Sequence, residues 1–175
     1  MMQYPPRHEA PVMSLRETLK HRLNDAWQGT PWYGDSSNKI LAGITAADAA
    51  RQVAPGTHTI WEIALHMTAW TEAVAGRARG MGAREPERGD WPKPQGTSTE
   101  AWTAVLADLA AARNQLLTDV DAAHEEDLQL HVKNHSPPFA DTGISRANTV
   151  VGLIEHDAYH LGQIALLKRA LRATP

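Results

Sequence analysis

Apolar residues recur at helical spacing in four long segments of the chain, and the stretches between these segments are rich in glycine, proline and charged residues. In the first segment the apolar positions are spaced four residues apart, at Leu15, Leu19, Leu23 and Trp27. Ser14 and Glu17 have the spacing of a capping box, in which a hydroxyl and a carboxylate satisfy free amides at the start of a helix. The pattern predicts a helix over residues 14–28, preceded by a loose, flexible arm over residues 1–13 that contains three prolines.

The other long segments carry similar signals. Thr59 and Glu62 repeat the capping-box spacing, and Thr97 and Glu100 repeat it again before a run rich in alanine and leucine. The last segment has an apolar stripe without an equally clear cap. The further long helices are expected over residues 59–79, 97–123 and 146–172.

The connections, of about 17 to 30 residues, are longer than the two to eight that are usual in simple bundles. "TAADAARQ", which begins at Thr45, predicts a short helix with that threonine as its cap, and the stretch over residues 124–144 admits a short strand or turn. Helices with a single apolar stripe must bury it against one another. The sequence therefore predicts an all-α four-helix bundle with long crossover connections, which forms a single domain over residues 14–175.

Composition narrows the classes of function. The formal net charge is -3, and no basic face is present, so a nucleic-acid partner is not expected. No apolar run approaches the roughly 18 residues that span a bilayer, and the N-terminus lacks the apolar segment of a secretory signal. A cytoplasmic protein without a membrane partner is therefore expected. Since the chain has no cysteine, any metal site must use histidine or carboxylate ligands.

Two histidines four residues apart interrupt the apolar stripe of the last helix. His156 and His160 are separated by one turn, so their Cβ atoms lie about 6 Å apart and both rings can reach one ion. The alternative is a pair of packed core histidines without a ligand. A second pair, His131 and His135, has the same spacing but lies among asparagine, serine and prolines, where a helix is not expected.

A third histidine favours the metal-site interpretation. His66 lies two turns into the helix expected at residues 59–79, on the same face as Ile63 and Trp70. Three inward imidazoles, two from one helix and one from another, can hold a metal and leave one coordination position open. Burial of three neutral imidazoles without partners would be costly, and a shared ion provides a physical reason for their placement.

The segments that carry these histidines resemble the DinB/YfiT-like superfamily of metal-binding four-helix bundles. The similarity is carried by "THTIWEIALHMTAW" at residues 57–70 and "GLIEHDAYHLGQIALLKRAL" at residues 152–171, and more weakly by "PWYG" at 31–34 and "LAGITAADAA" at 41–50. The resemblance implies that His66, His156 and His160 are the metal ligands. Related members often read W-H-G where this chain has Tyr33 after Trp32, so a histidine role is lost at that position.

The resemblance also implies the chemistry. The expected cofactor is a divalent metal, zinc or nickel, and the expected activity is transfer of a low-molecular-weight thiol to an electrophilic small-molecule substrate. Two alternatives remain: a hydrolase that uses metal-activated water, and a non-catalytic protein of the stress or binding type that is stabilised by its metal. A homodimer is compatible with a bundle of this kind.

Supporting residues are expected close to the histidines. Glu62 could accept from the distal N–H of His66 or act as a base, although the capping box is its alternative role. Gln163 could hydrogen-bond a metal-bound water. Asp157 is expected to point to a neighbouring helix or to a ligand histidine. Three tryptophans are candidates for the wall of a pocket, with core packing as the alternative: Trp32, Trp61 and Trp70.

Overall fold

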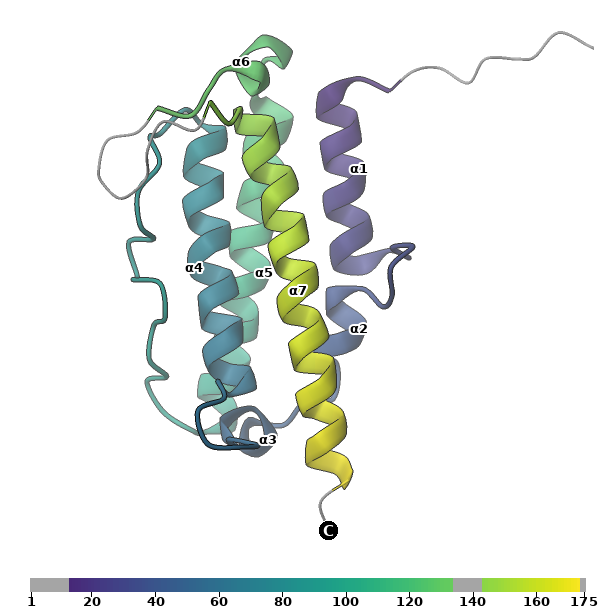
Figure 1. Cartoon of the computed structure of the whole chain (residues 1–175), viewed down its shortest axis with the longest axis vertical. Helices are drawn as coiled ribbons and strands as arrows, with labels where there is room; N and C mark the ends of the chain where they lie inside the picture. The colour runs from purple at the N-terminus through teal and green to yellow at the C-terminus, as the bar shows by residue number, and fades with distance from the viewer. Residues whose placement is uncertain (1–12, 134–142, 174–175) are drawn as a thin grey trace, which may run out of the picture.

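The computed structural model describes residues 13–133 and 143–173, and this part of the chain contains seven helices. The long ones are α1 (Leu15–Gln28), α4 (Ile60–Ala78), α5 (Thr99–Ala122) and α7 (Arg146–Ala173), and the short ones are α2 (Ser37–Leu41), α3 (Ala46–Ala50) and α6 (Glu125–Gln129). The four long helices pack side by side as the expected all-α bundle (Figure 1). The arm expected over residues 1–13 lies outside the described residues, apart from Met13.

The helix starts follow the local signals of the sequence, with one shift. Both predicted capping boxes are present at the starts of α1 and α4, and the Thr45 side chain accepts from the amide of Asp48 at the start of α3. The predicted cap of α5 at Thr97 is wrong by one residue, because the hydroxyl of Ser98 accepts from the amide of Ala101 instead. Three consecutive residues with hydroxyl side chains precede Glu100, and spacing alone could not choose among them.

The connections differ from the prediction in their details. The first contains the unpredicted helix α2, and the last contains α6 and an isolated antiparallel bridge between His131 and Ser145. The connection between α4 and α5, residues 79–98, returns along the outer side of α4, so that α4 and α5 run parallel (Figure 1). We call residues 79–98 the crossover. A crossover was expected, and here it covers a side of the bundle (Figure 1).

Salt bridges attach the crossover to the helices beneath it. The guanidinium of Arg88 pairs with Glu72 of α4 at 2.7 Å and with Asp108 of α5 at 3.1 Å. Further along, the ammonium of Lys93 lies 3.0 Å from the carboxylate of Glu62. Exposed pairs of this kind each contribute at most about 1 kcal/mol, but together they fix the path of the crossover over α4.

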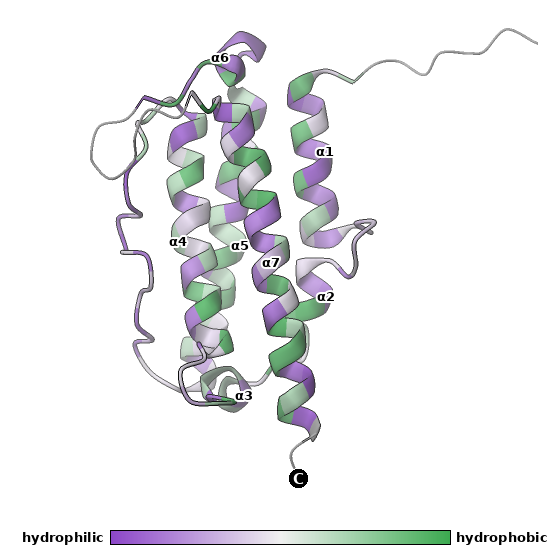
Figure 2. Ribbon diagram, viewed as in Figure 1, coloured by the Kyte–Doolittle hydropathy of each residue, from purple (hydrophilic) through white to green (hydrophobic). Residues whose placement is uncertain are grey.

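Apolar side chains fill the bundle in two clusters, one at each end. Ile60, Trp61, Met67 and Leu109 lie in one of them, while Leu19, Leu23, Leu116 and Val150 lie in the other. Each such side chain contributes about 1.5–3 kcal/mol through its removal from water. Along α7 the buried apolar positions stop at Leu153 and resume at Leu161, and hydrophilic stretches interrupt the helix (Figure 2). A polar layer therefore crosses the middle of the bundle.

No helix in the described part of the chain is long and apolar enough to cross a membrane.

Candidate metal centre

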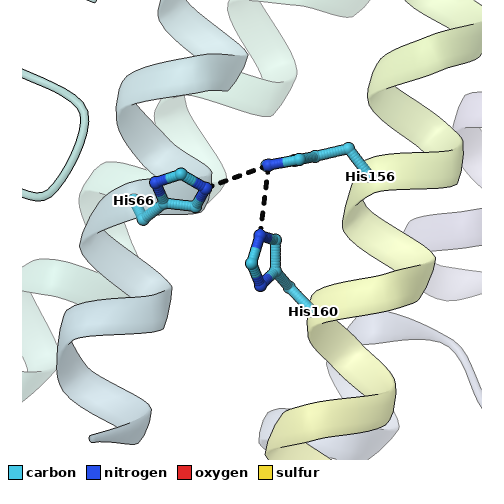
Figure 3. Close-up of side chains that lie close together, drawn as sticks. All are labelled: His66, His156 and His160. Carbon is cyan, nitrogen blue, oxygen red and sulfur yellow. Dashed lines mark hydrogen bonds between the residues drawn. The ribbon is translucent and has the colours of Figure 1, made fainter. Parts of the chain in front are cut away.

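Three histidines meet in this polar layer, between α4 and α7. His66 projects from α4 toward α7, and His156 and His160 project toward it from successive turns of α7 (Figure 3). Their placement follows from helix geometry, because residues four apart lie on one face of a helix and α4 packs directly against α7. The structure thus brings together the three residues that the sequence singled out.

The Nε2 atoms of the three rings converge. The Nε2 of His156 lies 2.9 Å from the Nε2 of His66 and 3.1 Å from the Nε2 of His160 (Figure 3). One ring nitrogen from each residue lies within 4.8 Å of the others. In a tetrahedral zinc site with Zn–N distances near 2.0–2.1 Å, the nitrogens are about 3.3 Å apart. The spacing is therefore close to that of a set of ligands around one ion.

Hydrogen bonds fix the distal nitrogens of two of these rings. The Nδ1 of His66 lies 2.6 Å from the main-chain carbonyl oxygen of Asp90, and the Nδ1 of His160 lies 2.7 Å from the side-chain oxygen of Gln163. Because both partners are acceptors, each Nδ1 carries the proton and donates it. In a neutral imidazole this leaves the Nε2 lone pair free. Both rings therefore present a lone pair to the centre, which is the arrangement that metal ligands require.

The third ring has a different neighbour. The Nδ1 of His156 is buried without a hydrogen-bond partner, and it lies 3.8 Å from the Oδ1 of Asp157, which is also buried without one. The other carboxylate oxygen of Asp157 lies 3.4 Å from the guanidinium of Arg113 on α5. Asp157 thus points to a neighbouring helix and lies beside a histidine of the cluster. A small rotation would give His156 a carboxylate acceptor.

Burial keeps two of the imidazoles neutral. Removal from water lowers the pKa of His66, although the hydrogen bond to Asp90 opposes this effect. Removal from water likewise lowers the pKa of His160, while its bond to Gln163 opposes the change. A depressed pKa favours the unprotonated ring near neutral pH. The neutral ring is the form that binds a metal.

An aromatic stack from the crossover holds His66 in place. The ring of Trp91 lies parallel to the imidazole of His66, with the centroids 3.9 Å apart, and its other face stacks on His58 at 3.6 Å. The indole N–H of Trp70 donates to the carboxylate of Asp90 at 2.7 Å. Neither Asp90 nor Trp91 was predicted from the sequence. The available signal was an Asp-Trp pair within a connection that is otherwise rich in glycine, proline and charge.

The expected supporting residues have the following partners. Glu62 has its alternative role, since it accepts from the amide of Thr59 in the capping box and pairs with Lys93, while the main-chain carbonyl of Asp90 accepts the distal N–H of His66. Gln163 was expected to hydrogen-bond a metal-bound water, and in the structure its side-chain oxygen accepts from His160. Glu62 therefore supports the start of α4, and Gln163 orients a candidate ligand.

The three tryptophans fall into three environments. Trp61 is buried in the core against Trp102, with ring centroids 5.3 Å apart, and Trp32 is 93% exposed. Only Trp70 of the three lies beside the histidines, edge-on to His66. Of the second histidine pair, His131 lies in the isolated bridge with Ser145, and His135 lies outside the described residues.

A cavity of about 460 Å³ opens next to the histidines, in the groove between α4 and α7. His66 and His156 form one end of its wall, and Trp70, Leu153 and Arg77 are among the residues that line the remainder. A second cavity of about 480 Å³, between α1, α2 and α5, contains none of the three histidines in its wall. A small molecule in the first cavity would therefore lie directly against the cluster.

The chemistry of the cluster is compatible with binding of a divalent metal. Three neutral imidazoles suit zinc, nickel, iron or copper. In the described residues no carboxylate or further histidine joins the group of three, so the protein supplies three ligands rather than four. A site of this kind leaves a position for a water or a substrate, which is typical of catalytic rather than structural zinc sites.

A family model described as the DinB superfamily matches residues 34–164, about three quarters of the chain. No curated protein and no solved structure matches the chain. The matched range contains the helix start at Thr59, the crossover and all three histidines of the cluster. The chain belongs to the DinB superfamily.

Proposed function

We propose that this protein is a divalent-metal-dependent enzyme that transfers a low-molecular-weight thiol to an electrophilic small molecule. His66, His156 and His160 would hold the metal, zinc or nickel, through their Nε2 atoms. The observation that carries the proposal is the convergence of these three nitrogens, two of them with the distal Nδ1 already engaged by an acceptor. These two partly buried acceptors fix the tautomer in which Nε2 carries the lone pair, as the partners of metal-bound histidines do.

When bound, the metal would act as a Lewis acid that lowers the pKa of a coordinated thiol, so that the thiolate could attack the electrophile. The chain has no cysteine, so the sulfur would come from the bound molecule. The protein would orient the imidazoles through Asp90 and Gln163, and Trp91 would fix the plane of His66. The cavity between α4 and α7 offers the thiol or its acceptor a largely apolar wall beside the centre.

Elemental analysis of the chain, purified without a metal-chelating tag, tests the metal centre. We expect one divalent ion per chain, and we expect His66→Ala and His160→Ala to lose it. His131→Ala is the matched control, because His131 lies in the bridge with Ser145 and outside the cluster. Retention of the ion in both cluster variants, or its loss in the His131 control, would contradict the assignment.

A screen of thiols against electrophiles tests the reaction. We expect consumption of the thiol and the electrophile in equal amounts, and we expect the activity to disappear in His160→Ala. Ester or amide hydrolysis that needs no thiol would instead support a hydrolase. One tightly held ion without any turnover, together with a large loss of stability on its removal, would support a metal-stabilised binding protein.

A further inference from the structure

The cavity beside the histidines extends away from them along α4 and ends at a cation. His66, Trp70, Val74 and Arg77 follow one another at intervals of three or four residues, so they share a face of α4 and all line the cavity. On the opposite side α7 contributes Asn148, Thr149, Gly152 and Leu153, and the remaining lining residues are His156, Ile144 and, from the crossover, Asp90. The cavity therefore has the histidine cluster at one end and a guanidinium at the other.

The guanidinium of Arg77 makes few of the hydrogen bonds that it could donate. Its Nε is buried without a hydrogen-bond partner, and its Nη2 donates to the carbonyl of Arg84 at 3.4 Å. Among residues 13–133 and 143–173 it forms no ion pair, while the nearby Glu72 is paired with Arg88. Its burial lowers the pKa of Arg77, which reflects the cost of removing a charge from water without a counter-ion.

A simpler role for Arg77 does not account for this arrangement. A basic residue in the last turn of a helix interacts favourably with the helix dipole, and Arg77 lies in the last turn of α4. An Arg77 side chain that extends into solvent would interact with the helix dipole equally well. Here the guanidinium instead lies over the ring of Trp70, with Cζ 5.5 Å from the ring centroid, and faces the cavity. This position is suited to an anion that enters the cavity.

The length of the cavity limits the ligand. The Trp70 ring lies between the two ends, 5.5 Å from the Cζ of Arg77 and 6.4 Å from the ring centroid of His66. The two ends are thus separated by no more than about 12 Å, the sum of these spans, which is an upper limit for a ligand that contacts both. An extended chain of eight bonds is about 10 Å long and stays below this limit. Between them the wall is formed by Trp70, Val74 and Leu153 and is mostly apolar.

We propose that this cavity binds an elongated molecule with an apolar body and a terminal carboxylate, which pairs with Arg77 while the other end of the molecule meets the histidine cluster. The proposal rests on the proposed function in one respect, because it identifies the bound thiol as an elongated molecule with a terminal carboxylate. A guanidinium can bind a carboxylate through two parallel N–H donors, and the part of the Arg77 side chain that lines the cavity is available for this. The ligand would thus supply the counter-ion that Arg77 lacks.

Matched probes test the carboxylate. Binding of ω-mercaptooctanoic acid and of ω-mercaptooctanol to the zinc-loaded protein is measured by calorimetry, with the zinc content determined for every variant. We expect Arg77→Gln to raise the Kd of the acid about tenfold and to leave that of the alcohol unchanged, since a hydrogen bond to a charged group is lost only for the acid. Arg77→Lys should have a smaller effect, and Arg169→Gln, an exposed position on α7, should have none. Equal effects of Arg77→Gln on both probes, or no effect on either, would overturn the proposal.

Two glycines of α7 test the location. Gly152 and Gly162 are both exposed, and a Cβ added at either one meets nothing within 4 Å, but Gly152 lines the cavity and Gly162 does not. A side chain can therefore begin at either position without a clash at its Cβ, and leucine favours the helix over glycine. We expect Gly152→Leu to raise the Kd of both probes at least tenfold and Gly162→Leu to change neither. Unchanged binding in Gly152→Leu would place the probes elsewhere and contradict the proposal.

The metal-free protein separates this inference from the proposed function. If the chain binds no zinc, the metal centre fails, but octanoate and octanol can still be compared on the same variants. Octanoate binding that weakens in Arg77→Gln while octanol binding does not would then support the carboxylate site alone. One zinc ion per chain, together with probes that are indifferent to Arg77 and Gly152, would leave the metal centre standing and refute the site.

Discussion

The Nδ1 of His66 donates to the carbonyl oxygen of Asp90 across 2.6 Å, although the two residues lie 24 positions apart in the sequence. The acceptor belongs to the main chain, so the bond depends directly on the path of the crossover. Two contacts set that path locally: Trp70 donates to the Asp90 carboxylate, and Trp91 stacks on His66. The orientation of one candidate ligand is therefore controlled by a segment outside the helices.

Replacement of Trp91 should reveal this control. Trp91→Ala removes the stack on His66 and loosens the carbonyl that accepts from it, while all three histidines remain. We expect the affinity for zinc to fall about tenfold, which is the lower end of the range for loss of a group that orients a ligand. Competition with a chelator measures the zinc affinity of each variant. Trp32→Ala is the control, because Trp32 is 93% exposed and its ring contacts Tyr33 rather than any of the three histidines. An equal loss in both variants would refute a specific role for Trp91.

Gln163 should be needed as an acceptor and not as a filler of space. Gln163→Leu keeps much of the side-chain volume but leaves the Nδ1–H of His160 without its partner at 2.7 Å. We expect the zinc affinity to fall between about 10-fold and 100-fold. Gln163→Glu retains an acceptor oxygen at this position and should bind zinc at least as tightly as the unaltered protein. If the leucine variant bound zinc normally, His160 would not depend on this bond, and the orientation argument would fail.

The ion pair between Arg113 and Asp157 should matter for stability. Both side chains are buried, 4% and 2% exposed, and the Arg113 guanidinium also donates to the hydroxyl of Ser37 at 2.7 Å. Arg113→Met leaves the carboxylate buried without its cation, so we expect the free energy of unfolding of the metal-free protein to fall by about 3–5 kcal/mol. Urea denaturation measures this quantity.

The double variant Arg113→Met, Asp157→Leu tests the reason for that loss. It removes both charges, and a buried apolar pair of similar volume is often as stable as a buried ion pair. We therefore expect the double variant to regain most of the stability lost by Arg113→Met. If it were less stable than the single variant, Asp157 would contribute chiefly through contacts other than its pair with Arg113.

Local patterns in the sequence were sufficient to predict the bundle and the three histidines. The apolar spacing and the capping boxes at Ser14 and Thr59 act within a few residues, and the sequence displays such signals directly. His156 and His160 are one turn apart, so their common direction follows from helix geometry alone. The meeting of this pair with His66 required only that α4 and α7 be neighbours, which is usual in a small bundle.

The groups around the histidines could not be predicted in the same way. The carbonyl of Asp90 and the ring of Trp91 reach His66 only because the crossover returns along α4, and no local pattern encodes that path. The cavity is likewise formed by two helices together. Its cationic end, Arg77, looks from the sequence like an ordinary basic residue near the end of a helix.

Glu62 should affect the stability of the fold and leave metal binding unchanged. Its partial burial raises its pKa, but the hydrogen bond from the Thr59 amide and the interaction with Lys93 outweigh this, so the pKa lies below its ordinary value. A carboxyl group with a depressed pKa in the folded state stabilises the protein above the unfolded pKa of about 4.3, and this contribution is lost as the pH falls through the folded pKa.

We expect Glu62→Ala to lower the free energy of unfolding by about 1 kcal/mol at pH 7, with the difference shrinking in acid. Glu62→Gln, which can still form a capping box, should lose less at pH 7. Denaturation series at several pH values, with zinc content measured in parallel, check both parts. A loss of zinc in Glu62→Ala without a loss of stability would return Glu62 to the metal centre and contradict its assignment as a cap.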